Sequence, residues 1–599
     1  MAEVLFLVLR RLRAPLIVLI AVYAVSIAGL VAIPGVDPDG RPWRMSFFHA
    51  LYVMSYTATT IGFGEIPYPF TDAQRLWVTA AIYLSVVGWA YAIGTVFALS
   101  QDAAFRAATA RGLFVRRVAR LREPFCVVCG YGRSGHAIAA ALDALGARIV
   151  IVDADPLRLA PIEIQPFRAV PLVLAADARR PEVLRDAGIA QPECRAVIAL
   201  TGDDEANQAI AIGTRVLDPT TRVIARVVEP VVEANLAAFG DVQVINPYRT
   251  FATNVGLGFG APEVLQLEEW LTGAPGTQRP EPLRLPRGHW VLAGYGRFGQ
   301  PLAAALEEAG QSWQAFDPGV ATPDGAADRV LGCGGPEEGL RECGIERAVG
   351  VIAGTDSDTS NLAVIAMARR VAPRAAIVVR RNKAYNSALF EAAAPTATFV
   401  QSDVMVHEVL QALTTPLLER FLALAREDGA AVARQAIAEL EAAFGDRVPR
   451  VWTFECDLSR PGLRQAFEGD APPRVGELLL DPRDPSVRLR AVPLLLARGR
   501  ADPTPPAAAL AARARTPVRG EVLDRRPTSG RDVVMPEPEL ELQPGDRLLI
   551  AGDEGVEALQ RRFLLDPSPI AFVRTGREPA RGWLFRRLER GRARRVPPG

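Results

Sequence analysis

Two kinds of glycine-rich motif in this chain of 599 residues carry groups that could do chemistry. The first occurs once, around residue 60, as the run TTIGFG. Its glycines permit unusual backbone angles, so that successive carbonyls can point into a narrow axis and replace the water around a cation. The Thr60 hydroxyl is one more oxygen that could face a cation. The candidate residues are Thr59, Thr60, Ile61, Gly62, Phe63 and Gly64.

The second motif, GxGxxG, occurs twice, and each copy follows an apolar run and opens an Ala/Leu-rich segment typical of a helix. Its glycines let the backbone approach a diphosphate, which the free N–H groups and the positive end of the helix would bind. Asp153 ends the next predicted strand and could accept hydrogen bonds from an adenosine ribose. A carboxylate there repels a 2′-phosphate, so NAD(H), ATP or ADP are expected rather than NADP(H). The loop residues of the first copy are Gly130, Tyr131, Gly132, Arg133, Ser134 and Gly135.

The two copies form a tandem repeat. The glycine loop and Asp153 recur 164 residues later, and the segment VIALTGDDEAN, from Val197, matches VIAGTDSDTSN, from Val351. Each copy reads as strand, glycine-rich turn, helix, strand and acidic residue, which predicts two Rossmann-like lobes. The candidate residues of the second copy are Gly294, Gly296, Gly299 and Asp317.

Two segments, residues 14–33 and 76–99, are apolar enough to span a bilayer as helices, which takes about 20 residues. Arginines flank both segments, so the positive-inside bias places both termini in the cytoplasm and residues 35–75 in an outward-facing hairpin. Residues 46–58 are apolar but too short to cross, which predicts a re-entrant helix. The flanking arginines are Arg10, Arg11, Arg13, Arg106, Arg111, Arg116, Arg117, Arg120 and Arg122.

With this short helix before it and Glu65 after it, the TTIGFG run resembles the selectivity filter of potassium channels, threonine-x-glycine-aromatic-glycine. The resemblance implies four chains around one axis, because a single loop cannot enclose an ion. Phe63 replaces the commoner tyrosine and lacks the hydroxyl that makes a hydrogen bond behind the filter. Gly88 lies where related pores place a gating hinge, and close helix packing is the alternative role. The implied K+ ligands are Thr60, Ile61, Gly62 and Phe63.

Residues 122–403, with a TrkA-C-like stretch near 535–565, resemble the RCK or TrkA-N family of regulators in bacterial potassium channels and transport systems. Lobes of that family assemble into a ring beneath the pore, so four chains imply eight lobes. In the family, the residue at the position of Asp177 often contacts the nucleotide. Thr201 is a further candidate for nucleotide binding. The matching stretch of the second copy, LGCGGPE, has no such aspartate, so the first site is expected to bind more tightly.

The expected fold class is a two-helix potassium-channel pore joined to Rossmann-like tandem RCK domains and a small α/β C-terminal lobe. The net charge of +1 gives no global field that would favour nucleic acid. No cleavable signal peptide is evident, and the bacterial inner membrane is the expected location. The expected parts are the pore 1–100, a linker 101–123, the first lobe with its crossover helix 124–285, the second lobe with following helices 286–445, the C-lobe 446–570 and a basic tail 571–599.

These features favour a ligand-gated potassium channel over two alternatives. A membrane-anchored NAD-dependent oxidoreductase would need a catalytic residue, and none of the four histidines is a good candidate, so an enzyme is not expected. A regulatory component of a potassium transporter would share the cytoplasmic lobes, but such components are normally soluble and this chain carries its own pore. The histidines are His49, His136, His289 and His407.

Overall fold

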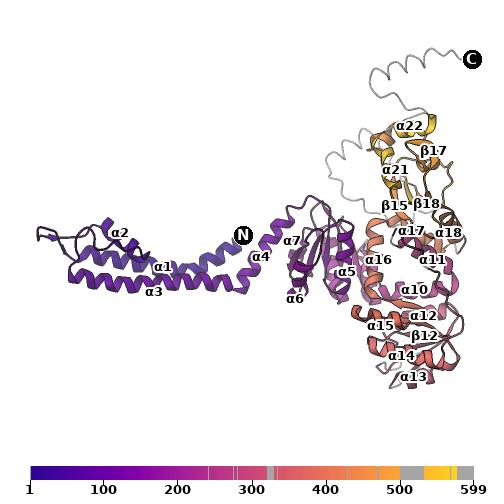
Figure 1. Ribbon diagram of the computed structural model, residues 1–599, viewed down its shortest axis with the longest axis horizontal. Coiled ribbons are helices and arrows are strands. Elements are labelled where there is room, and N and C mark those ends of the chain that lie inside the picture. Colours follow the sequence, from indigo (N-terminus) through magenta and orange to yellow (C-terminus); the bar gives the residue numbers. More distant parts are fainter. Residues whose placement is uncertain are drawn as a thin grey trace, which may run out of the picture. The chain divides into compact units, whose positions relative to one another are not determined.

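The computed structural model divides into two compact units, Met1–Arg120 and Leu121–Gly599 (Figure 1). A Pro/Ala/Arg-rich stretch within the predicted C-lobe, residues 501–519, and the part of the predicted basic tail from residue 577 lie outside the described residues. The structure describes residues 2–240, 242–273, 275–279, 281–319, 329–332, 335–427, 430–468, 471–498, 532–566 and 568–576.

The first unit is built on two long helices, α1 (Ala2–Ala32) and α3 (Asp72–Gln101). Their segments Leu9–Ala32 and Asp72–Gln101 are long and apolar enough to cross a membrane. The two helices pack on each other, and the Trp77 indole N–H donates a hydrogen bond to the Ser26 carbonyl oxygen at 3.0 Å. These two helices confirm the two predicted apolar spans.

The hairpin between them contains the short helix α2 (Phe47–Ala58), which begins at Ser46. The Ser46 hydroxyl accepts a hydrogen bond from the backbone N–H of His49 at 3.3 Å and so caps the helix. The buried face of α2, including Val53 and Met54, packs against Leu30 of α1 and Ala81 of α3. The remaining elements of this unit are β1 (Gly35–Val36), β2 (Pro42–Trp43) and α4 (Ala103–Val118).

The second unit contains two six-stranded parallel sheets with the same strand order, β5-β4-β3-β6-β7-β8 and β11-β10-β9-β12-β13-β14. This is the order of a dinucleotide-binding fold, and it confirms the two predicted Rossmann-like lobes. The central strands are continuous apolar runs because both faces of each sheet are covered. The strands are β3 (Phe125–Cys129), β4 (Arg148–Asp153), β5 (Leu172–Ala175), β6 (Cys194–Ala199), β7 (Arg222–Arg226), β8 (Val242–Ile245), β9 (His289–Ala293), β10 (Ser312–Phe316), β11 (Val330–Leu331), β12 (Ala348–Ala353), β13 (Ala376–Arg380) and β14 (Ala397–Phe399).

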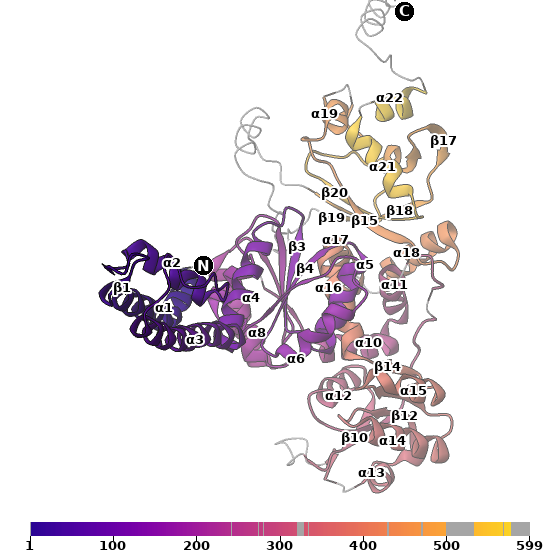
Figure 2. The same ribbon diagram turned by 60° about the vertical axis from the view of Figure 1, so that its left-hand side comes forward.

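The two lobes exchange helices. Helix α10 (Pro247–Gly260) follows the first sheet in the chain but packs on α12 (Gly299–Glu308) and enters the core of the second lobe. Conversely, α16 (Gln401–Thr414) follows the second sheet but packs on α5 (Arg133–Ala144), as Figure 2 shows. Met405, Val409 and Ala412 of α16 complete the core of the first lobe. Each lobe therefore depends on the other for part of its core.

A smaller C-lobe contains an antiparallel sheet with the order β15-β20-β18-β19. One face of this sheet packs on α11, α17 and α18, and the other on α19 and α21. The elements are α11 (Pro262–Thr272), α17 (Pro416–Glu427), α18 (Ala430–Phe444), β15 (Arg450–Glu455), α19 (Pro461–Phe467), β18 (Ala491–Ala497), β19 (Asp532–Val534), β20 (Arg547–Gly552), α21 (Val556–Leu565) and α22 (Ser568–Thr575).

Buried and half-buried carboxylates gather where α11, α16 and α17 meet. Burial raises the pKa of Glu408 on α16 to about 7, and the negative charges of Glu268 and Glu419 add to the effect. The positive charge of Arg426 acts in the opposite direction and lowers the pKa of Glu408, and Arg426 also forms an ion pair with Glu268. Burial also raises the pKa of Glu269 to about 7, and the neighbouring Glu268 contributes.

This cluster predicts that the second unit loses stability as the pH rises from about 4.5 through about 7. In that range Glu408 keeps a proton in the folded protein that the unfolded chain has released. Its contribution to the free energy of unfolding is therefore fully present below the unfolded pKa and is lost above the folded pKa. Glu408→Gln should remove on the order of 2 kcal/mol of this dependence. The measurement is thermal unfolding of the full-length protein at pH 5.5 and 8, followed by tryptophan fluorescence, since Trp270 is fully buried on α11.

The control is Glu427→Gln, because Glu427 is exposed at the end of α17. It should leave the pH dependence unchanged. Equal pH dependence in Glu408→Gln and the wild type would show that Glu408 is not the titrating group.

Candidate functional site

The TTIGFG run has an alternating backbone. Thr60, Gly62 and Gly64 have positive φ values of 64°, 68° and 92°, whereas Ile61 and Phe63 between them do not. A change of handedness at every second residue lets successive carbonyls face one side, whereas in a strand they alternate. A β-branched residue such as Thr60 rarely adopts a positive φ, so the surroundings must hold this conformation.

Hydrogen bonds fix the run at both ends. At its N-terminal end, the Thr60 N–H donates to the Thr57 carbonyl oxygen at 3.1 Å, and the Thr59 hydroxyl donates to the Ser55 carbonyl oxygen at 2.8 Å. At its C-terminal end, the Glu65 carboxylate accepts hydrogen bonds from the Phe70 N–H and the Arg75 Nε, each at 2.8 Å. The backbone of the predicted filter is therefore held between α2 and the start of α3.

Gly88 is buried on the side of α3 that faces α1. A Cβ added to Gly88 would lie 3.4 Å from Leu19 Cδ2 and 3.8 Å from Val22 Cγ2. Helix α3 continues through this position without a break. The contact favours close packing, and the gating hinge stays a prediction.

The first glycine loop joins β3 to α5 with close backbone packing. Gly130 has a φ of 99°, and a Cβ on Gly135 would lie only 2.0 Å from the Gly130 carbonyl oxygen. Gly132 is the N-cap of α5, and a Cβ there would have no atom within 4 Å. The first N–H groups of α5 thus have space in front of them, which is the geometry that binds anions at a helix N-terminus.

Asp153 shapes this loop from the end of β4. Its carboxylate, which is 5% exposed, accepts hydrogen bonds from the Tyr131 N–H at 2.6 Å and the Asp155 N–H at 2.8 Å. In the second copy, Asp317 accepts the corresponding hydrogen bond from the Tyr295 N–H at 2.8 Å. Both predicted ribose carboxylates therefore lie beside their glycine loops, at the carboxyl edge of the sheet.

An asparagine in each lobe, which the sequence analysis did not name, supports the candidate site from behind. Asn207 Oδ1 accepts from the Thr201 N–H at 2.9 Å, and its Nδ2 donates to the Arg226 carbonyl oxygen at 2.8 Å. Asn361 makes the same two hydrogen bonds, at the same distances, with the second-copy residues that correspond to Thr201 and Arg226. Both asparagines lie in the matched segments TGDDEAN and TDSDTSN, so the repeat itself carried the signal.

Asp177 follows β5 and forms an ion pair with Arg179 at 2.8 Å, and this hydrogen-bonded guanidinium lowers the pKa of the carboxyl. Asp203 caps α8 (Asp204–Leu217), and Asp204 accepts hydrogen bonds from the Val228 and Glu229 N–H groups at 2.6 and 2.8 Å. The three consecutive acidic residues Asp203, Asp204 and Glu205 therefore form the start of a helix. Among the described residues, no group of three or more His, Cys, Asp or Glu could hold a metal ion.

The second glycine loop differs in its surroundings. Phe298 stands where the first copy has Ser134, and its ring contacts Phe399 and Tyr248, with centroid distances of 4.8 and 5.9 Å. The Arg380 guanidinium lies over the Tyr248 ring at 5.4 Å, and burial lowers its pKa. The start of α12 is thus packed into an aromatic cluster. Of the aspartate-lacking stretch at residues 331–337, Cys333 and Gly334 lie outside the described residues.

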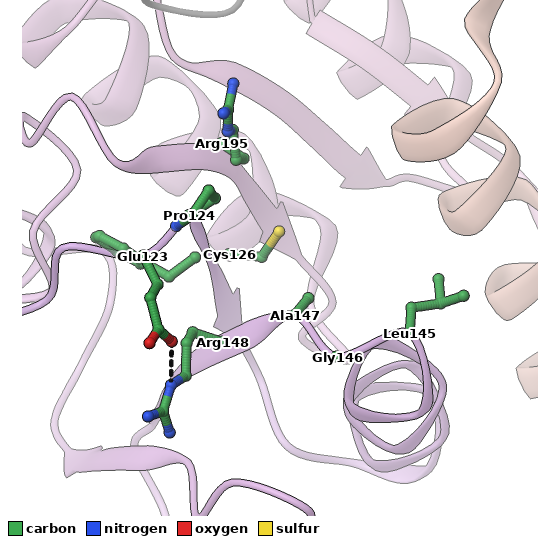
Figure 3. Close-up of a pocket in the computed structure, with 9 residues that line it drawn as sticks. Glu123, Pro124, Cys126, Leu145, Gly146, Ala147, Arg148 and Arg195 are labelled. Carbon is green, nitrogen blue, oxygen red and sulfur yellow. Dashed lines mark hydrogen bonds and ion pairs between the residues drawn. The ribbon is translucent and has the colours of Figure 1, made fainter. Parts of the chain in front are cut away.

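A separate pocket of about 350 Å³ lies at the opposite end of the first sheet (Figure 3). It opens where β3 and β4 begin, whereas the glycine loop follows the end of β3. Glu123 and Arg148 form an ion pair on its rim at 2.8 Å. It therefore lies apart from the candidate nucleotide site. Its lining includes Glu123, Pro124, Cys126, Leu145, Arg148 and Arg195.

Family models match three parts of the chain, an ion channel over residues 16–101 and a TrkA-N domain over residues 126–247 and again over 290–401. The chain therefore contains an ion-channel domain followed by two TrkA-N domains, which confirms the resemblance stated from the sequence.

Three curated relatives match parts of the chain. An uncharacterized protein of Methanothermus fervidus is 28% identical over 247 residues, and Potassium channel protein 1 of Methanocaldococcus jannaschii is 26% identical over 203 residues. These cover 41% and 34% of this chain. With Probable potassium channel protein 2 of the same archaeon included, the chain spans 37%, 59% and 63% of the lengths of these relatives. The GsuK channel bound to NAD is a similar solved structure, with 17% identity, a TM-score of 0.43, and coverage of 94% of this chain and 99% of that one.

Proposed function

We propose that this chain, which joins an ion-channel domain to two TrkA-N domains, is one subunit of a ligand-gated potassium channel. The observation that carries the proposal is the alternation of positive φ at Thr60, Gly62 and Gly64, directly after a short helix that lies between two apolar helices. Such a backbone presents carbonyls to one side, where they would replace the hydration shell of K+. The named potassium channel relatives of Methanocaldococcus jannaschii support this ion.

The channel is proposed to be a homotetramer in the bacterial inner membrane. One filter loop per chain cannot enclose an axis, and the Ile61 and Phe63 side chains, each 61% exposed in the single chain, would be covered by neighbouring chains. Four chains would contribute eight lobes to a cytoplasmic ring. The arginines at the ends of the two spans support cytoplasmic termini.

The ligand is proposed to be NAD(H) or ATP/ADP at the first glycine loop. The open N-terminus of α5 would take the diphosphate, and the remaining lone pairs of Asp153 would accept from a ribose hydroxyl. Arg158, a cation beside the proposed ribose site, lies 3.7 Å from Asp153 and 3.5 Å from Asp155. Because these two carboxylates already balance its charge, it is not available to bind a 2′-phosphate. The aromatic packing of Phe298 supports weaker binding at the second loop.

Gating would follow from the position of the first loop between the lobes. The Arg133 guanidinium on this loop donates a hydrogen bond to the Asn382 carbonyl oxygen in the second lobe. A nucleotide that changes this contact would shift the equilibrium between two arrangements of the lobes. The free energy of this shift cannot exceed the difference between the nucleotide's binding free energies for the two arrangements. The linker helix α4 would pass the change to α3, with Gly88 as the proposed hinge.

The test is potassium flux through the purified protein in liposomes, with NAD+, NADH, ATP and ADP added separately on the side of the large domains. Selective flux that one nucleotide changes would support both parts of the proposal and identify the ligand. Absence of K+ flux under every condition would overturn it. Turnover of a nucleotide by the same sample would instead favour a membrane-anchored oxidoreductase, and flux of K+ only with a separate pore protein would favour a transporter component.

Asp153→Asn is expected to abolish the nucleotide response and to leave the K+ selectivity of the filter unchanged. The amide keeps the shape of the side chain but replaces one acceptor oxygen by a donor. The two carboxylate oxygens accept from the Tyr131 and Asp155 N–H groups respectively, so one of these hydrogen bonds is lost and the loop is no longer held in place for the ribose. The measurement is flux with and without the active nucleotide. Asp317→Asn is the matched variant in the second lobe and should have a smaller effect; an unchanged response in Asp153→Asn would contradict the assignment.

A further inference from the structure

Tyr56, near the end of α2, is connected to three residues of the proposed filter. Its carbonyl oxygen accepts hydrogen bonds from the Ile61 N–H at 2.9 Å and the Gly62 N–H at 3.4 Å. Its hydroxyl donates a hydrogen bond to the Gly64 carbonyl oxygen at 2.5 Å. With 4% of its surface exposed, Tyr56 is shielded from competing water. One residue of the short helix thus holds both the middle and the outer end of the filter.

The rings behind the filter explain why this hydroxyl matters. The Phe63 ring stacks on Tyr52 with a centroid distance of 6.2 Å and meets the edge of Tyr56 at 5.6 Å. Phe63 can fill this space but has no hydroxyl with which to hold the backbone. In this chain the hydroxyl comes from the helix behind the filter, one ring away.

Gly64 is the residue that most needs such support. It has a φ of 92° and no side chain, so its peptide group has more rotational freedom than its neighbours. The next residue, Glu65, is fixed by Phe70 and Arg75. The Tyr56 hydroxyl therefore holds a glycine peptide of the filter that has no side chain of its own to restrict it.

We propose that the Tyr56 hydroxyl is a positioning group that keeps the Gly64 peptide oriented and the filter in its conducting form. The inference rests on the proposed function. Without the hydroxyl, the Gly64 carbonyl rotates more freely, the outer filter populates non-conducting arrangements, and discrimination between K+ and Na+ falls.

The test is Tyr56→Phe in the full-length protein, recorded as single channels in planar bilayers. Removal of the hydroxyl should shift the equilibrium between conducting and non-conducting filter states about fivefold toward the non-conducting state, the factor contributed by one ordinary hydrogen bond. The K+/Na+ permeability ratio should fall as well. Nucleotide affinity of the same sample should equal that of the wild type, because the lobes are unchanged.

Tyr68→Phe is the control, since Tyr68 lies in the outer loop and its ring contacts Trp43 at 5.2 Å. It should behave as the wild type. A second variant, with 4-aminophenylalanine at position 56, keeps a donor at the same place and should restore wild-type gating. If Tyr56→Phe does not assemble, the gating of this variant, compared with that of the wild type, tests the proposal.

Wild-type gating and selectivity in Tyr56→Phe, in a wild type that conducts K+, would overturn this inference alone. Failure of the 4-aminophenylalanine variant to restore gating would overturn it too. A wild type without K+-selective current would overturn the proposed function and this inference together.

Discussion

Gly62→Ala is expected to reduce K+-selective flux by a factor of about 100 or more. Gly62 has a φ of 68°, in the left-handed region, where a Cβ meets its own backbone and costs roughly 1–2 kcal/mol per residue. The cost is local, because a Cβ at Gly62 would have no other atom within 4 Å. In the proposed tetramer it would arise four times at one axis. The measurement is K+ against Na+ flux through reconstituted protein.

The matched control is Gly94→Ala. Gly94 is helical in α3, and a Cβ there also has no atom within 4 Å. Alanine favours helix over glycine by up to about 1 kcal/mol, so this variant should assemble and keep its selectivity. Selective flux through Gly62→Ala at the wild-type level would show that the TTIGFG run does not form the filter.

Gly132→Ala is expected to weaken nucleotide binding at least about 30-fold without loss of stability. Gly132 lies outside the left-handed region, with a φ of −76°, and the protein leaves room for a methyl group. The methyl group would instead occupy the space in front of α5 where the diphosphate must approach the backbone. The measurements are titration calorimetry with NAD+, NADH, ATP and ADP, and thermal unfolding of the same sample.

Gly296→Ala is the control in the second lobe, because its Cβ would also have no atom within 4 Å. Since the start of α12 is packed around Phe298, this variant should change the affinity less. If Gly296→Ala weakened binding more than Gly132→Ala, the second lobe would be the principal site. If neither weakened it, the glycine loops would not be the binding sites.

The elements that local geometry determines were predictable from the sequence. The glycines at 62 and 130 are needed for positive φ, and a fixed spacing of glycines and an acidic residue determines how a strand, a turn and a helix meet. The internal repeat added a check that a single motif lacks. Had the matched segments been compared residue by residue, Asn207 and Asn361 would also have been predicted.

Features that depend on distant packing were not predictable. The sequence predicted a crossover helix after the first lobe and helices after the second, but not that Met405, Val409 and Ala412 of α16 complete the core of the first lobe. The difference between Ser134 and Phe298 is visible in the sequence, yet its meaning requires the position of Tyr248 on the exchanged helix α10. The bond from Tyr56 to Gly64 depends on the path of the loop between them.

The exchange of α10 and α16 also bears on the order in which the chain can fold during synthesis. The first sheet is complete once β8 has left the ribosome, but its core still lacks Met405, Val409 and Ala412. Meanwhile α10 carries Tyr248, Val255 and Phe259, whose partners are not yet synthesised. The first lobe must therefore wait, with an open core, for the whole second sheet. A nascent chain at this stage would be a natural client for chaperones, and a premature stop before α16 would leave a product whose first lobe cannot be completed.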